Sequence, residues 1–183
     1  MKKPALILAF FAVSCANNNQ NLSGDITLYD YDVEGKIKEL GISLQEPSKP
    51  VANYVNAVKA GKLVFMAGKG PKKSDGAYIT GKVGSDLSIE QGYEAARLTA
   101  IQQLSALKAE IGDLNNVVRI VKVLGMVNAD PAFTEHPSVI NGFSDLMVEV
   151  FGERGKHARA AVGMASLPTN IACEIEMIVE VKE

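Results

Sequence analysis

The chain has 183 residues, which suits one domain, or one domain with an appendage. With 47% hydrophobic and 22% charged residues, its composition is that of a globular protein and argues against disorder. The 19 basic and 21 acidic residues give a formal charge of -2, and the two Cys and two His lack metal-ligand spacing, so we predict neither a nucleic-acid partner nor a metal site.

The N-terminus has the pattern of a secretory signal peptide. Two lysines precede an apolar run of about nine residues, which is too short to cross the roughly 30 Å core of a bilayer as a helix. Small residues and then the Asn-rich tract 17–21 follow, which favours an exported protein over one with a buried N-terminal helix.

Cys15 ends a sequence, Ala-Val-Ser-Cys, that resembles a bacterial lipobox, although Ala12 stands where Leu is usual. Lipidation of Cys15 would give a membrane-anchored lipoprotein, whereas cleavage after Ala16 would give a periplasmic protein without a lipid. We therefore predict a lipoprotein-type signal peptide over 1–15, a flexible linker over 16–32 and one domain over 33–183. Cys173, the other cysteine, lies among apolar residues and is interpreted as a small buried hydrophobe rather than a nucleophile.

The domain begins with a short helix predicted over 33–40. Residues 54–58 and 63–67 flank a turn signal and are expected to form a β-hairpin, and a further short strand is predicted over 78–83.

The clearest element is a helix predicted over 89–111, because apolar residues recur at three- and four-residue steps and Ser88 begins a capping box. A strand, a second amphipathic helix and two more strands follow, over 117–127, 137–151, 157–165 and 171–181. Separated strands with two long helices predict an α+β fold, with the helices packed on one face of the sheet. Val162, Met164 and Ile175 suggest that the other face is partly apolar, which favours oligomerisation through the sheet.

The C-terminal third resembles the RidA/YjgF family, formerly called the L-PSP endoribonuclease family. The resemblance rests on His-Ala-Arg-Ala-Ala-Val at 157–162, Leu-Pro at 167–168 and Glu-Ile-Glu-Met-Ile at 174–178, and it extends over about 45–182. A subgroup with Gly-Lys-Val-Gly (81–84), Asn-Gly-Phe-Ser-Asp (141–145) and Val-Gly (162–163) is more similar still.

This resemblance implies a chorismate-mutase-like fold with a mixed sheet, a homotrimer, and a cleft between each pair of subunits. It also implies hydrolysis of 2-imino acids and enamines to 2-oxo acids and ammonia, without a cofactor. The partner would then be a small carboxylate or imino acid.

Five residues match the family's site. Arg159 would hold the substrate carboxylate, for which its planar fork is suited. Glu174 would position water and exchange protons with the reacting groups. The backbone carbonyl of Ala161 would contact the substrate nitrogen or the water, while Tyr54 and Asn141 would line the cleft.

The chain also departs from the family pattern. His157 stands where Pro is usual, Ala160 where Ser or Thr is usual, and Ala-Gly-Lys at 67–69 where Ser-Gly-Gln is common. His157 could titrate beside Arg159, and the lysines at 69, 72 and 73 could attract an anion; a solvated strand end and loop are the simpler interpretations.

Three functions remain open at this point. The first is an exported imine or enamine deaminase, and the second is a non-catalytic trimer that binds small carboxylates. The third, a ribonuclease, is disfavoured because the chain has no basic excess and no pair of histidines suited to phosphodiester chemistry.

Overall fold

The computed structural model describes residues 28–48, 50 and 52–183. The predicted signal peptide, Cys15 and most of the predicted linker therefore lie outside the described residues. In chain order the elements are α1 (Val33–Glu39), β1 (Ala57–Ala60), β2 (Leu63–Lys69), α2 (Ile89–Ile111), β3 (Val117–Asn128), α3 (His136–Phe151), β4 (Ala158–Met164) and β5 (Cys173–Val181), joined in part by short 3-10 turns.

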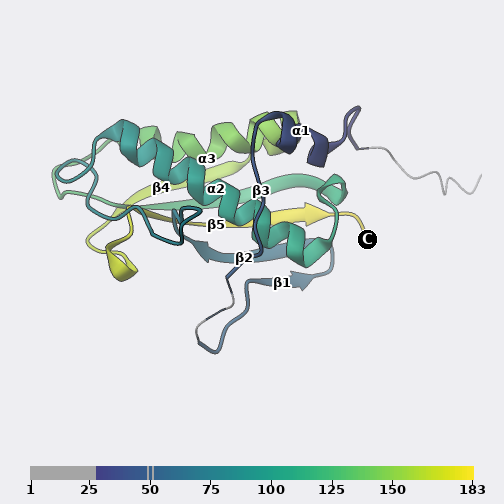
Figure 1. Ribbon diagram of the computed structural model, residues 1–183, viewed down its shortest axis with the longest axis horizontal. Coiled ribbons are helices and arrows are strands. Elements are labelled where there is room, and N and C mark those ends of the chain that lie inside the picture. Colours follow the sequence, from purple (N-terminus) through teal and green to yellow (C-terminus); the bar gives the residue numbers. More distant parts are fainter. Residues whose placement is uncertain (1–27, 49, 51) are drawn as a thin grey trace, which may run out of the picture.

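The five strands form one mixed sheet in the order β1-β2-β5-β3-β4. Only β3 and β4 pair in parallel, and α3 is the crossover between them; the other pairs are antiparallel. Both long helices pack on one face of this sheet, as expected for an α+β fold (Figure 1).

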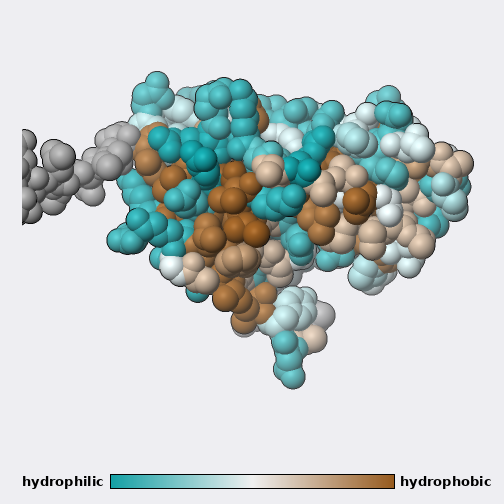
Figure 2. Space-filling view, turned by 180° about the vertical axis from the view of Figure 1, so that it is seen from behind, coloured by the Kyte–Doolittle hydropathy of each residue, from teal (hydrophilic) through white to brown (hydrophobic). Residues whose placement is uncertain are grey.

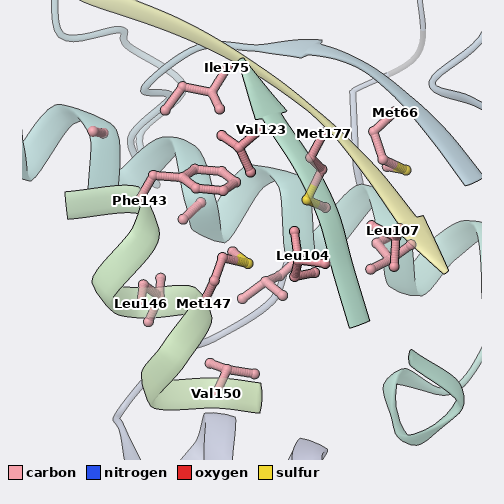
Figure 3. Packing of buried hydrophobic residues seen from close by; sticks show 14 of the residues in the cluster. Met66, Leu104, Leu107, Val123, Phe143, Leu146, Met147, Val150, Ile175 and Met177 are labelled. Atoms are coloured by element: carbon pink, nitrogen blue, oxygen red, sulfur yellow. The ribbon is translucent and has the colours of Figure 1, made fainter. Parts of the chain in front are cut away.

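The hydrophobic core lies between these helices and the sheet. Figure 3 shows Phe143 and Met147 of α3 and Leu104 of α2 directed toward Val123 and Met177 of the strands. All five side chains are fully or almost fully buried. The helix predicted over 89–111 is found with these same ends as α2, because its capping box, formed by Ser88 and Gln91, and its apolar periodicity agree.

The predicted strands over 157–165 and 171–181 are found one or two residues shorter, as β4 and β5, and two other predicted strands differ more. The hairpin's first strand starts at Ala57 rather than at Tyr54. Over 78–83 there are only isolated bridges, such as Thr80 to Ile171, because Gly81 and Gly84 take positive φ values of 120° and 98° that interrupt an extended strand.

The linker predicted over 16–32 reaches too far, because its last residues pack on the domain. Tyr29 is 8% exposed and donates a hydrogen bond to the carbonyl of Val117, while Tyr31 donates to the carbonyl of Val150. Asp32 caps the N-terminus of α1. These hydrogen bonds hold α1 beside the sheet and α3.

The face of the sheet away from the helices is open and carries a hydrophobic patch, seen from behind in Figure 2. Phe65 is 43% exposed there and Val162 39%, and a shallow hollow of about 270 Å³ is lined by Phe65, Leu124 and Ile178 among others. Ile175, expected on this face, is instead fully buried in the core, because the odd-numbered residues of β5 face the helices. Within the described residues, no helix is both long and apolar enough to cross a membrane.

Candidate functional site

Arg159 lies on β4, the edge strand, and its side chain is on the same side of the sheet as α3. Its Nη1 donates hydrogen bonds to Asn141 Oδ1 and Ser144 Oγ, both at 2.9 Å. Asn141 and Ser144 are three residues apart on α3, so one flank of the helix presents both acceptors to the guanidinium.

The charge of Arg159 is not matched by a carboxylate. Among the described residues it forms no ion pair, and its Nε and Nη2 donate to no protein acceptor. A partly buried guanidinium that is held through one nitrogen keeps a fork of N–H donors for an outside group. That fork has the geometry of a bidentate carboxylate contact.

Ser144 also joins Arg159 to His157. The Nδ1 atom of His157 lies 2.7 Å from the carbonyl of Gly155, which can only accept, so Nδ1 carries the proton. In the neutral ring Nε2 then accepts from the Ser144 hydroxyl, 3.1 Å away, while the hydroxyl oxygen accepts from Arg159. Burial lowers the pKa of His157, with the charge of Arg159 as a smaller cause, and this favours the neutral ring that such a chain of hydrogen bonds requires.

Ala161 follows Arg159 by two residues, so it lies on the same side of β4, where it packs against the core. Because β4 is an edge strand, one side of its backbone is free of ladder partners in this sheet. The structure therefore brings Arg159, Asn141 and Ala161 into one region.

Glu174 lies in a different place. It is on β5 and directed to the open face of the sheet, opposite the face on which Arg159 lies, and β3 separates the two strands. Its carboxylate rests against Gly68: a Cβ atom at that position would lie 2.2 Å from Glu174 Oε1. Partial burial raises the pKa of Glu174, and the neighbouring charge of Glu176 adds to the increase.

The contact with Gly68 depends on a β-bulge in β2. Met66 pairs with Met177 and Lys69 with Ile175, so β2 has one more residue here than β5. Gln103 of α2, fully buried, donates its amide to the carbonyls of Ala67 and Ile175 at 3.0 and 2.6 Å. A helix side chain thus supplies hydrogen bonds at the point where the bulge disturbs the ladder, and the bulge places Gly68 beside Glu174.

Tyr54 is 52% exposed and lies before β1. It lines a small pocket of about 180 Å³ together with Gly68, Lys69 and Lys72. Tyr54 therefore belongs to the region of Glu174 and Gly68, and the predicted residues form two groups within one chain: Arg159 with Asn141 and Ala161, and Glu174 with Tyr54.

Sequence reasoning gave no role to Ser144, Gly68 or Gln103. Ser144 and Gly68 belong to the sequence patterns at 141–145 and 67–69, but only the structure shows which residues they contact. Nothing in the helical pattern distinguishes Gln103 from its neighbours. Cys173 is fully buried, as predicted, and burial raises the pKa of its thiol to about 12, so it is not a reactive thiolate. Across the described ranges, no group of three or more His, Cys, Asp or Glu side chains is arranged to hold a metal ion.

Comparisons with known proteins agree with this fold. Residues 34–181 match the family described as "YjgF/chorismate mutase-like, putative endoribonuclease". Protein TCP17 of Trypanosoma cruzi is 43% identical over 149 residues, which are 81% of this chain and 93% of that protein. A RutC family protein of Pyrococcus abyssi is 28% identical over 138 residues, 75% of this chain and 93% of that protein.

Two solved structures are also similar. A crystal structure of a protein of unknown function from Agrobacterium tumefaciens is 44% identical with a TM-score of 0.77, over 82% of this chain and 92% of that one. A structure described as a "putative endoribonuclease" from Shewanella oneidensis is 28% identical with a TM-score of 0.80, over 82% of this chain and all of that one (100%). Together these matches confirm the predicted chorismate-mutase-like α+β fold.

Proposed function

This chain belongs to the YjgF/chorismate mutase-like family, and we propose that it hydrolyses reactive 2-imino acids and enamines to 2-oxo acids and ammonia. The observation that carries the proposal is the guanidinium of Arg159, which Asn141 and Ser144 hold while leaving it without a carboxylate partner. A 2-imino acid supplies the missing carboxylate, and the positive charge also stabilises the electron-rich carbinolamine next to it.

Glu174 supports the chemical step. A water oxygen adds to the imine carbon, and Glu174 accepts one of its protons and returns it to the nitrogen. Glu174 next accepts the hydroxyl proton of the carbinolamine and passes it to the nitrogen, so that the C–N bond breaks, ammonia leaves, and a C=O bond forms. The raised pKa of Glu174 suits this exchange, because a carboxyl that titrates closer to neutrality gives up its proton and takes it back more easily.

The site requires a second copy of the chain. Arg159 and Glu174 lie on opposite faces of one sheet, so one copy cannot direct both at one small substrate. The open face carries Phe65, Val162 and a hydrophobic hollow, which is the surface that a neighbouring copy would cover (Figure 2). We propose a homotrimer in which Arg159 of one copy and Glu174 of the next share a cleft.

The oligomer is tested by light scattering or small-angle X-ray scattering on protein that lacks residues 1–20. A trimeric mass is expected. A monomeric mass at micromolar concentration would remove the shared cleft and with it the catalytic arrangement.

The reaction is tested with an amino-acid oxidase that generates imines from a panel of amino acids, while imine loss is followed with and without the protein. We expect Arg159→Ala to abolish acceleration and Arg159→Lys to reduce it strongly, because Lys lacks the planar fork. Arg97→Lys is the matched control, since Arg97 pairs with Glu149 on the outer surface of the helices. Full activity in Arg159→Ala would contradict the assignment.

The alternative is a trimer that binds small carboxylates without catalysis. It is favoured by the absence of side-chain hydroxyls at Ala67 and Ala160, since those positions carry Ser or Thr in the archetype. Glu174→Gln separates the two functions: in a deaminase it lowers turnover and leaves 2-oxo acid binding intact, whereas in a pure binder it changes nothing measurable. Glu153→Gln is the control, because Glu153 is exposed and forms an ion pair only with Lys156 among the described residues.

We also propose that the protein is exported and anchored by a lipid at Cys15. Mass spectrometry of membrane fractions should find a lipidated N-terminus at Cys15, and Cys15→Ala should release the protein. A mature N-terminus at Asn17 would instead indicate ordinary cleavage after Ala16 and a periplasmic protein.

A further inference from the structure

Two lysines to which the proposed reaction gives no role line a pocket beside Tyr54 and Gly68. The pocket, of about 180 Å³, lies between the segment before β1 and the end of β2. Lys69 and Lys72 contribute to its wall, and Tyr54 and Tyr78 flank it, each about half exposed. We call it the Lys69–Lys72 pocket.

A chain of hydrogen bonds brings the two ammonium groups to the same wall. Lys69 Nζ donates to Asn56 Oδ1, and the amide of Asn56 donates to the carbonyl of Ser48 at 3.2 Å. Lys72 Nζ donates to Ser48 Oγ at 2.7 Å. Both ammonium groups are therefore fixed on Ser48 and Asn56 rather than free in solvent.

Every acceptor in this series of hydrogen bonds is uncharged. In the part of the chain that the structure describes, neither Lys69 nor Lys72 forms an ion pair. Burial lowers the pKa of Lys69, so keeping it protonated has a cost, and its ammonium group has a neutral amide oxygen rather than a carboxylate as its partner. The protein as a whole has a formal charge of -2, so this local excess of positive charge is not a general property of its surface.

The floor of the pocket leaves room for a ligand. Gly68 and Gly70, on either side of Lys69 in the sequence, both line it. A Cβ atom at Gly70 would lie 2.8 Å from Ile171 Cδ1 and 3.4 Å from the ring of Tyr78, so a larger residue would push into these walls. The volume suits a small group rather than a nucleotide or a peptide.

From these contacts we infer that the Lys69–Lys72 pocket binds a small oxyanion, a carboxylate or a phosphate, between its two lysines. The oxyanion neutralises two neighbouring cations that have only uncharged partners, and it receives charge-assisted hydrogen bonds from both. Its source is either a free inorganic or organic anion, or a second acidic group of the substrate, since Gly68 lies both in this pocket and against Glu174. The inference does not require that the protein hydrolyse imines.

Binding is measured by calorimetric titration of the mature protein with inorganic phosphate and with malonate. Both titrations use the Arg159→Ala background, so that Arg159 cannot supply the anion site. Saturable binding is expected, and Lys69→Met or Lys72→Met should weaken it by about tenfold or more, the effect of removing one charged partner from a partly desolvated site. Lys73→Met, a change at an exposed neighbour, should leave it unchanged, and Lys69→Arg should preserve it.

Thermal melts without ligand show whether each variant folds, and Lys72→Met serves if Lys69→Met does not. No binding of either anion, or binding that is equal in both methionine variants and in their parent, overturns the inference. The source is then assigned with Arg159 intact. If the protein binds a 2-oxo dicarboxylate more tightly than 2-oxobutyrate, and Lys69→Met removes this difference, the anion is the second acidic group of the substrate. If it binds phosphate but shows no such difference, the anion is a free one.

Discussion

Gly68→Ala tests whether Glu174 must lie where the structure places it. The added Cβ would be 2.2 Å from Glu174 Oε1 and 3.0 Å from Cδ and Cγ, whereas ordinary contact begins near 3.4 Å. The carboxylate therefore has to move by about 1.2 Å, since the backbone of a strand is less free to move than the end of a side chain.

The expected magnitude follows from this displacement. Misplacing a catalytic group by about 1 Å can cost on the order of a hundredfold in rate, so kcat/KM for imine hydrolysis should fall by about that factor. Stability should change little, because Gly68 does not have a positive φ and the contact is with a flexible side chain. A small gain is even expected from the reduced freedom of the unfolded chain.

The assay compares kcat/KM and melting midpoint in wild type, Gly68→Ala, Glu174→Ala and the double variant. If alanine at 68 acts only through the carboxylate, it should have less than about a twofold effect once Glu174 is alanine, and the two changes will be strongly non-additive. Wild-type kcat/KM in Gly68→Ala, or an equal loss in both backgrounds, would refute the reasoning.

Two further predictions concern stability. His157 has a lowered pKa in the fold, so the stability linked to its neutral form is present above the ordinary histidine pKa of about 6.5 and is lost as pH falls through the lowered value. Urea unfolding between about pH 7.5 and pH 5 should therefore show that the unfolding free energy depends less steeply on pH in His157→Gln than in the wild type. Equal slopes in the two proteins would contradict this. Gly142→Ala should cost about 3 kcal/mol of unfolding free energy, because its Cβ would lie 2.0 Å from the carbonyl oxygen of Tyr93 and force α2 and α3 apart. Gly92→Ala is its control: it has the same gain in helix propensity but meets only methyl groups of Val83 and Val139, the nearest at 3.1 Å. An equal loss in both variants would exclude the contact with the backbone of Tyr93 as the cause.

Most of the helices and strands could be predicted from the sequence, because their capping and turn signals agree with the pattern of residues that the fold buries. Residues 89–111 carry a cap, an apolar stripe and a terminating glycine, and the structure follows all three. The errors occur where a tertiary contact overrides the local pattern. Tyr29 and Tyr31 look like linker residues among polar neighbours, but their hydroxyls find carbonyls 88 and 119 residues away, which no local pattern encodes.

The two faces of β5 show a second limit. Strand periodicity correctly put Glu174 and Glu176 on one face, but it could not decide which face the helices cover, so Ile175 was expected on the wrong side. In the site, the family resemblance put Arg159 and Asn141 in one cleft, and the structure shows a hydrogen bond between them. The hydrogen bonds of Gln103 at the bulge depend on the packing of α2 on β2 and β5, which the sequence of none of these elements reveals alone.

The separation of Arg159 from Glu174 has a consequence that can be measured by mixing variants. If each site takes Arg159 from one copy and Glu174 from the next, Arg159→Ala and Glu174→Gln homotrimers are both inactive, but hybrid trimers contain some intact sites. Random reassembly from equal amounts should restore about one quarter of the wild-type sites, since each half is intact in half of the copies. The variants are unfolded together in urea, refolded and assayed for imine hydrolysis. Recovery that is absent, while refolded wild type regains full activity, would mean that both residues act from one copy, contrary to their places on opposite faces of the sheet.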